Sequence, residues 1–85
     1  MIHWEKWVKE QSLGSLPSYV RKGTWLGDDK VEVSLSRVEE GSKIWHEAVR
    51  INAQIVYQSG MNRHDSVYDA KRDICDRAEF WLENR

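Results

Sequence analysis

The clearest hydrophobic pattern along the chain lies in its last quarter, from about Asp65 to Asn84. Apolar residues recur there every three or four positions and form one stripe: Val67, Ala70, Ile74, Ala78 and Trp81, broadened by Tyr68, Cys75 and Leu82. This spacing is typical of an amphipathic α-helix with one buried face. Asn62 or Asp65 can cap its start, because a short polar side chain accepts a hydrogen bond from the free N–H groups of the first turn.

A strict alternation of apolar and polar residues runs from about Lys30 to Val38. Val31, Val33 and Leu35 point one way, and the polar residues between them point the other way. One buried face and one wet face are typical of a strand in a small antiparallel sheet. The turn-forming residues Gly27-Asp28-Asp29 join this segment to Tyr19–Leu26, so the two segments predict a β-hairpin.

The N-terminal segment predicts a short helix from about His3 to Gln11. Trp4, Trp7, Val8 and Gln11 follow the spacing of one helical face. Gly14 is placed to end this helix in a left-handed cap. So short a helix is marginal by itself, and we expect its tryptophans to dock it onto the rest of the protein.

The segment from Lys43 to Ser59 fits two patterns. Alternate positions are apolar, as in a strand, but the apolar residues also fall on one arc of a helix. A straight strand of about 16 residues would span about 50 Å, far more than the size of so small a domain, whereas a helix fits. We therefore predict a helix capped by Ser42 and Gly60. The alternative, favoured by the β-branched residues, is a bent third strand over residues 43–58.

These elements predict a single α+β domain over residues 1–85. Its order is a short N-terminal helix, a β-hairpin and two amphipathic helices packed on the sheet; the alternative order is α-β-β-β-α. Apolar residues make up 40% of the 85 residues and charged residues 32%, which is typical of a globular chain. The lone Cys75 cannot form an internal disulfide, and we find no signal peptide or membrane span, so we expect a cytoplasmic protein.

Charge removes one simple functional class. Lysine and arginine number 13 against 14 acidic residues. A protein that binds nucleic acid without sequence preference usually carries a net basic field, because most of the affinity comes from phosphate contacts. This chain has no such field.

The residues that could carry chemistry do not form a recognisable set. His46-Glu47 and His64-Asp65 are neighbours in sequence, and neighbours on a helix do not face each other. Cys75 lies beside the apolar stripe, where a small core residue is expected. Three histidines and one cysteine show no zinc-ligand spacing. We therefore expect no enzymatic activity, no cofactor and no metal; a cavity in which His46 or His64 met a carboxylate around a substrate would contradict this hypothesis.

The aromatic residues favour a protein partner. The chain has five tryptophans, more than a small core requires, and tryptophan is enriched at binding hot spots. On the C-terminal helix Phe80 falls among acidic residues, away from the apolar stripe, and Tyr57 falls on the polar side of the preceding segment. We predict a partner-binding surface of Phe80, Tyr57, Asp73 and Asp76, in a non-enzymatic module or homodimer. One such module would be a small inhibitor of a host defence or nucleoprotein complex, of the kind that phages and mobile elements encode.

The alternative is a small nucleic-acid-binding regulator. Asn62, Arg63 and His64 precede the C-terminal helix, whose free N–H groups favour an anion. Arg72 lies about two turns into that helix. These four residues are the predicted anion- or nucleic-acid-binding site. A salt series separates the two hypotheses, because phosphate contacts weaken steeply as salt rises.

Overall fold

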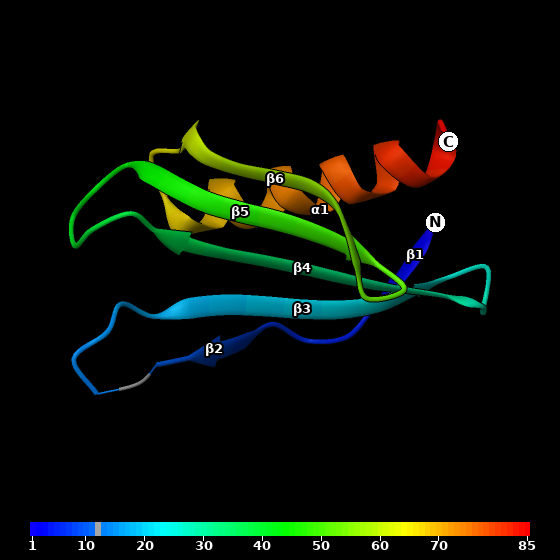
Figure 1. Ribbon diagram of the computed structural model, residues 1–85, viewed down its shortest axis with the longest axis horizontal. Helices are drawn as coiled ribbons and strands as arrows, with labels where there is room; N and C mark the ends of the chain where they lie inside the picture. Colours follow the sequence, from blue (N-terminus) through cyan, green and yellow to red (C-terminus); the bar gives the residue numbers. More distant parts are fainter. Residues whose placement is uncertain (12) are drawn as a thin grey trace.

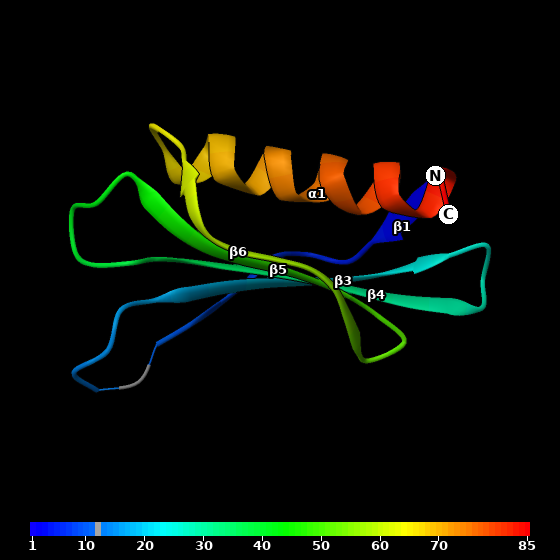
Figure 2. The same ribbon diagram turned by 45° about the horizontal axis from the view of Figure 1, so that its top comes forward.

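A six-stranded antiparallel sheet, covered on one face by a single helix, forms the protein in the computed structural model, which describes residues 1–11 and 13–85 (Figures 1 and 2). The strands are β1 (Ile2–Trp4), β2 (Val8–Glu10), β3 (Ser18–Trp25), β4 (Asp29–Arg37), β5 (Ile44–Ile51) and β6 (Gln54–Arg63), and the helix is α1 (Val67–Glu83). The strand order is β1-β3-β4-β5-β6, and β2 also pairs with β3.

The core lies between α1 and the sheet. The helix buries Ala70, Ile74, Ala78 and Leu82 along one stripe. The sheet buries Ile2, Trp25, Val31, Val33, Leu35, Trp45, Val49 and Ile51 beneath it. Because side chains alternate along a strand, the residues between these positions form the opposite face, which no helix of the described residues covers (Figure 2).

The predicted N-terminal helix is wrong, because residues 2–4 and 8–10 are strands. Ile2 pairs with Trp25 and Trp4 with Gly23, so Ile2 and Trp4 share one face of β1. Gly23 makes the approach possible, since a Cβ there would lie 2.7 Å from Ile2 Cγ2 and 2.9 Å from Trp4 Cε3. Val8, placed on the buried helical face by the sequence pattern, is 56% exposed.

The predicted helix over residues 43–59 is also wrong, and so is the single bent strand. The segment forms the hairpin β5–β6, which reverses at Asn52 and Ala53 with φ of 52° and 69°. Positive φ at both central residues is the conformation of a type I′ turn, whose twist suits a two-residue hairpin. The length argument failed because it assumed one straight strand. Ser42 and Gly60 cap no helix: the Ser42 hydroxyl accepts a hydrogen bond from Ile44 N, and Gly60 lies within β6.

The other two predicted elements are present. The hairpin is β3–β4, and the C-terminal helix is α1. The cap of α1 is Ser66 rather than Asn62 or Asp65, because the Ser66 hydroxyl accepts a hydrogen bond from Asp69 N over 3.1 Å.

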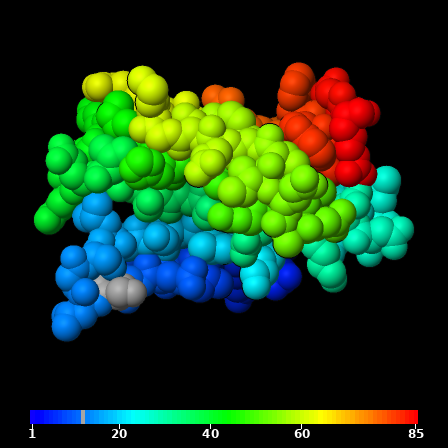
Figure 3. Space-filling view, viewed as in Figure 1, coloured from blue at the N-terminus to red at the C-terminus, as the bar shows by residue number. Residues whose placement is uncertain are grey.

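The two edges of the sheet differ. One edge is formed by β1 and β2, which have only 3 residues each. The other edge is β6, a strand of 10 residues that pairs on one side only. Figure 3 shows the face opposite α1: β6 (yellow-green) follows its upper border, and the C-terminal end of α1 (orange to red) emerges beside it. Within the described residues, β6 is therefore the long strand edge that is left unpaired, and it lies next to the helix.

Candidate functional site

A buried carboxylate lies in the core layer beneath α1. Glu47 occupies an inward position of β5 between Trp45 and Val49, and its side chain is 0% exposed. His64, which follows β6, is hydrogen-bonded through Nε2 to Glu47 Oε1 over 2.6 Å. Burying a charged carboxylate is costly unless it is paired and hydrogen-bonded, and His64 supplies this pairing.

Asn62 and Tyr57 complete the environment of Glu47 from β6. Asn62 Nδ2 donates hydrogen bonds to Glu47 Oε2 over 2.7 Å and to the Tyr57 hydroxyl over 2.6 Å. Both Glu47 oxygens therefore have partners. Among the described residues, no buried side-chain nitrogen or oxygen lacks a hydrogen bond.

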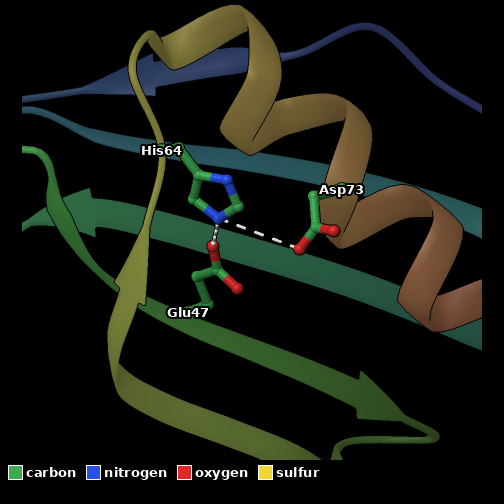
Figure 4. A group of neighbouring side chains, drawn as sticks. All are labelled: Glu47, His64 and Asp73. Carbon is green, nitrogen blue, oxygen red and sulfur yellow. Dashed lines mark hydrogen bonds and ion pairs between the residues drawn. The ribbon is translucent and has the colours of Figure 1, made fainter.

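The helix adds Asp73 and Arg77 to this cluster. Asp73 Oδ2 lies 3.8 Å from His64 Nε2 and accepts a hydrogen bond from Arg77 Nε over 2.8 Å. The Arg77 guanidinium also lies 5.1 Å from the centre of the Tyr57 ring, a cation–π contact. The hydrogen bond to Asp73 raises the pKa of Arg77, so this arginine stays charged. Figure 4 shows the His64 imidazole directed at the carboxylates of Glu47 and Asp73.

A groove of about 760 Å³ runs between β6 and the C-terminal half of α1, beside this cluster. Its walls are Tyr57 from the strand and Asp73, Asp76, Arg77, Phe80, Trp81, Asn84 and Arg85 from the helical side. The side chains of Glu47 and His64 are not part of its lining. The groove is therefore open to a ligand, whereas the buried pair faces protein.

The four residues of the predicted partner-binding surface line this one groove. Phe80 is 69% exposed, and Tyr57 faces it from β6 rather than from a second helix. Asp73 is held by Arg77. Asp76 makes no ion pair or hydrogen bond within the described part of the chain. Binding by these residues stays a prediction.

The four residues predicted to bind an anion do not form one set of free donors. Asn62 and His64 lie together, but both turn inward to Glu47. Arg63 is exposed at the end of β6, and Arg72 pairs with Asp69 over 3.6 Å on the helix surface. Nucleic-acid binding by these residues also stays a prediction.

The remaining sequence candidates lie elsewhere. His46 is on the uncovered face of the sheet, where its ring packs against Gly60. Cys75 is half-buried near Arg21, and burial raises the pKa of its thiol. Of the tryptophans, Trp25 and Trp45 are buried, and Trp4, Trp7 and Trp81 are half-buried against the core.

Glu47 was considered only as the sequence neighbour of His46 and was set aside, although the sequence carries a further signal for it. Trp45, Val49 and Ile51 alternate along β5, and Glu47 is the charged residue within that apolar series. A cavity in which His64 met a carboxylate around a substrate would contradict a non-enzymatic role. The contact between Glu47 and His64 supplies the histidine and the carboxylate of that observation. Pairing alone is not a catalytic site, which needs access for a substrate.

Comparison with known proteins does not add to this picture: no protein-family model matches the chain, and no curated protein or solved structure is similar to it. Function must therefore be inferred from the side chains themselves. Within the described residues, α1 lacks the length and apolar character that a bilayer-crossing helix needs.

Proposed function

We propose that this protein is a non-enzymatic protein-binding module that takes up an extended segment of a partner protein along β6. The observation that carries the proposal is the position of the long free edge of β6 beside an aromatic groove. Each half of this surface serves a different part of an extended segment.

The strand edge serves the backbone of the partner. An edge strand presents unpaired N–H and C=O groups, and an extended segment can add to it as a further strand. Proteins usually shield such edges with very short strands, as β1 and β2 do here. The length of β6, 10 residues, leaves room for such pairing.

The groove serves the side chains of the partner. Every second side chain of an added strand points to the same face of the sheet as Tyr57, toward α1. Phe80 and Trp81 give that side of the groove its apolar wall, and aromatic residues of this kind dominate binding energy when they become buried.

Charge narrows the choice of segment. Arg77 neutralises Asp73, but Asp76 has no partner within the described residues. A segment with an apolar residue for Phe80 and a lysine or arginine for Asp76 fits this surface. The inhibitor role expected from size and composition would use the same groove; nothing beyond size and composition supports it.

A display experiment tests the proposal. A library of random extended peptides is selected on the immobilised wild-type chain, and enriched peptides are titrated into labelled protein while amide signals are followed by NMR. We expect apolar–basic sequences to be enriched, and their binding to slow hydrogen exchange in β6. Phe80→Ala should weaken binding at least tenfold, since a hot-spot aromatic contributes about 2 kcal/mol or more.

Tyr68 offers a matched control for Phe80. Both are exposed aromatics on α1, at 72% and 69%. Tyr68 lines a second hollow with Trp7 and Lys71, which shares Asp76 with the groove. Tyr68→Ala should leave peptide binding unchanged. Equal losses for both variants, or protection of amides outside β6, would contradict the proposal. So would a stable dimer that pairs β6 with β6 of a second copy, seen by analytical ultracentrifugation, or selective binding of a polynucleotide that weakens steeply with salt.

A further inference from the structure

We infer that Glu47, His64 and Asp73 form a binding site for a divalent transition-metal ion, with zinc as the best fit. Each of the three residues offers one ligand atom, and these atoms all lie within 4.8 Å of one another. His64 Nε2 has Glu47 Oε1 and Asp73 Oδ2 as its carboxylate neighbours. They come from β5, from the residue after β6 and from α1. A metal ion here would join the helix to the sheet.

The geometry suits a metal with little rearrangement. Zinc binds imidazole nitrogen and carboxylate oxygen at about 2.0–2.2 Å, so neighbouring ligand atoms of a tetrahedral ion lie about 3.3 Å apart. The distances from His64 Nε2 are 2.6 Å to Glu47 Oε1 and 3.8 Å to Asp73 Oδ2, one shorter and one longer than this value. These two separations differ from that value by about 0.7 and 0.5 Å. The third separation, between the Glu47 and Asp73 ligand oxygens, is no more than 4.8 Å.

The donor set favours a borderline metal. One imidazole and two carboxylates suit zinc and its transition-metal neighbours, whereas calcium and magnesium favour sites made of oxygen alone. Two carboxylates also balance the charge of a divalent ion. Binding replaces the proton on His64 Nε2, which is released to solvent.

Neighbouring side chains orient one of the proposed ligands, Glu47, and compete with the metal ion for another, Asp73. Asn62 Nδ2 holds the second oxygen of Glu47 at 2.7 Å, which orients the carboxylate as outer-shell partners of metal ligands do. Arg77 Nε occupies the ligand oxygen of Asp73 at 2.8 Å. A bound ion must share that oxygen with Arg77 or displace the guanidinium from it.

Isothermal titration of Zn²⁺ into the tag-free full chain tests the site, with the thermal midpoint as a second readout. We expect one saturable equivalent and a midpoint that rises with Zn²⁺, because a ligand that binds only the folded state stabilises it. Asp73→Asn and His64→Gln should each weaken binding at least tenfold. Asn62→Ala should weaken it by about 10–100-fold, the usual effect of losing an outer-shell partner.

Arg77 gives a test with the opposite sign. Arg77→Gln removes the competing cation and should strengthen zinc binding several-fold, an outcome that loss of folding cannot mimic. The matched control is Arg72→Gln on the same helix, where the arginine pairs with Asp69 instead. His46→Gln controls for the histidine on the uncovered face of the sheet. Absence of saturable binding by the wild-type chain, or unchanged affinity in Asp73→Asn and Arg77→Gln, would overturn the inference; peptide binding along β6 would stand or fall separately.

Discussion

Glu47 and His64 meet at 2.6 Å beneath α1, beside the apolar core of the protein. Glu47 lies in β5 and His64 directly follows β6, so their contact ties the end of β6 to the centre of the sheet. Such a pair is weak evidence of net stabilisation, because desolvating the charge offsets the attraction. Removing one partner destabilises the fold, because the other partner is left buried without its hydrogen bond.

Truncating His64 should therefore destabilise the protein strongly. In His64→Ala, Glu47 keeps Asn62 but loses its charged or polar neighbour, and breaking a buried pair costs about 3–5 kcal/mol. Urea unfolding measures the loss in metal-free buffer. His46→Ala, at an exposed position of β5, should cost less than about 0.5 kcal/mol. Similar losses for the two variants would show that the Glu47 pair has no special role.

Two glycines of the sheet should respond differently to a methyl group. Gly23→Ala places a Cβ 2.9 Å from the backbone oxygen of His3, which cannot move without displacing β1, so we expect a loss of about 1–3 kcal/mol. In Gly60→Ala the nearest atom is Nδ1 of the exposed His46 ring, also at 2.9 Å, and the ring can rotate away. Thermal unfolding should show the smaller loss for Gly60→Ala; a larger one would contradict the structural explanation.

Ala53→Gly should stabilise the protein. Ala53 has a φ of 69° in the β5–β6 turn, and Asn-Gly is the preferred pair for such a turn. Relieving the left-handed conformation stabilises the folded state by about 1 kcal/mol. This gain is larger than the cost of the extra entropy that glycine gives to the unfolded chain. Chemical denaturation should show a gain of about 0.5 kcal/mol. Ala48→Gly, within β5, should have the opposite sign, because glycine weakens a strand.

Asp29 should make folding stability depend on pH in the acid range. Hydrogen bonds from Arg85 and then from Asn52 hold the pKa of Asp29 below its ordinary value of 3.8. A carboxyl with a lower pKa in the folded state stabilises the fold above its unfolded pKa, and this contribution disappears as pH falls through the folded pKa. Asp29→Asn should therefore be less stable than the wild type at neutral pH, with a difference that shrinks on acidification below about pH 4. In an Arg85→Ala background the pH dependence of that difference should decrease.

Local pattern predicted two of the elements. The alternation of Val31, Val33 and Leu35 and the helical stripe from Val67 to Leu82 each extend over enough residues to be recognised. The N-terminal strands have 3 residues each, too few for a period to show, and Trp4 is held by its fit over Gly23. That fit depends on a residue far along the chain, so local spacing could not reveal it.

The hairpin β5–β6 was not predicted, for a different reason. A type I′ turn usually carries Asn-Gly, but Ala53 occupies the glycine position, so the reversal gave no recognisable signal. The same error placed the residues of the candidate site on the wrong elements. Tyr57 and Phe80 were expected on two helices, whereas a strand and a helix bring them to one groove. Glu47 and His64 are brought together only because β6 pairs with β5, and sequence neighbours could not show this pairing.

The unequal edges of the sheet limit what this protein can assemble into. A strand that pairs with β6 occupies the long edge of the described sheet. The 3-residue strands at the opposite edge offer too few hydrogen bonds for a further strand to pair there. Growth by strand addition thus stops after a single step, giving a closed complex instead of a fibre.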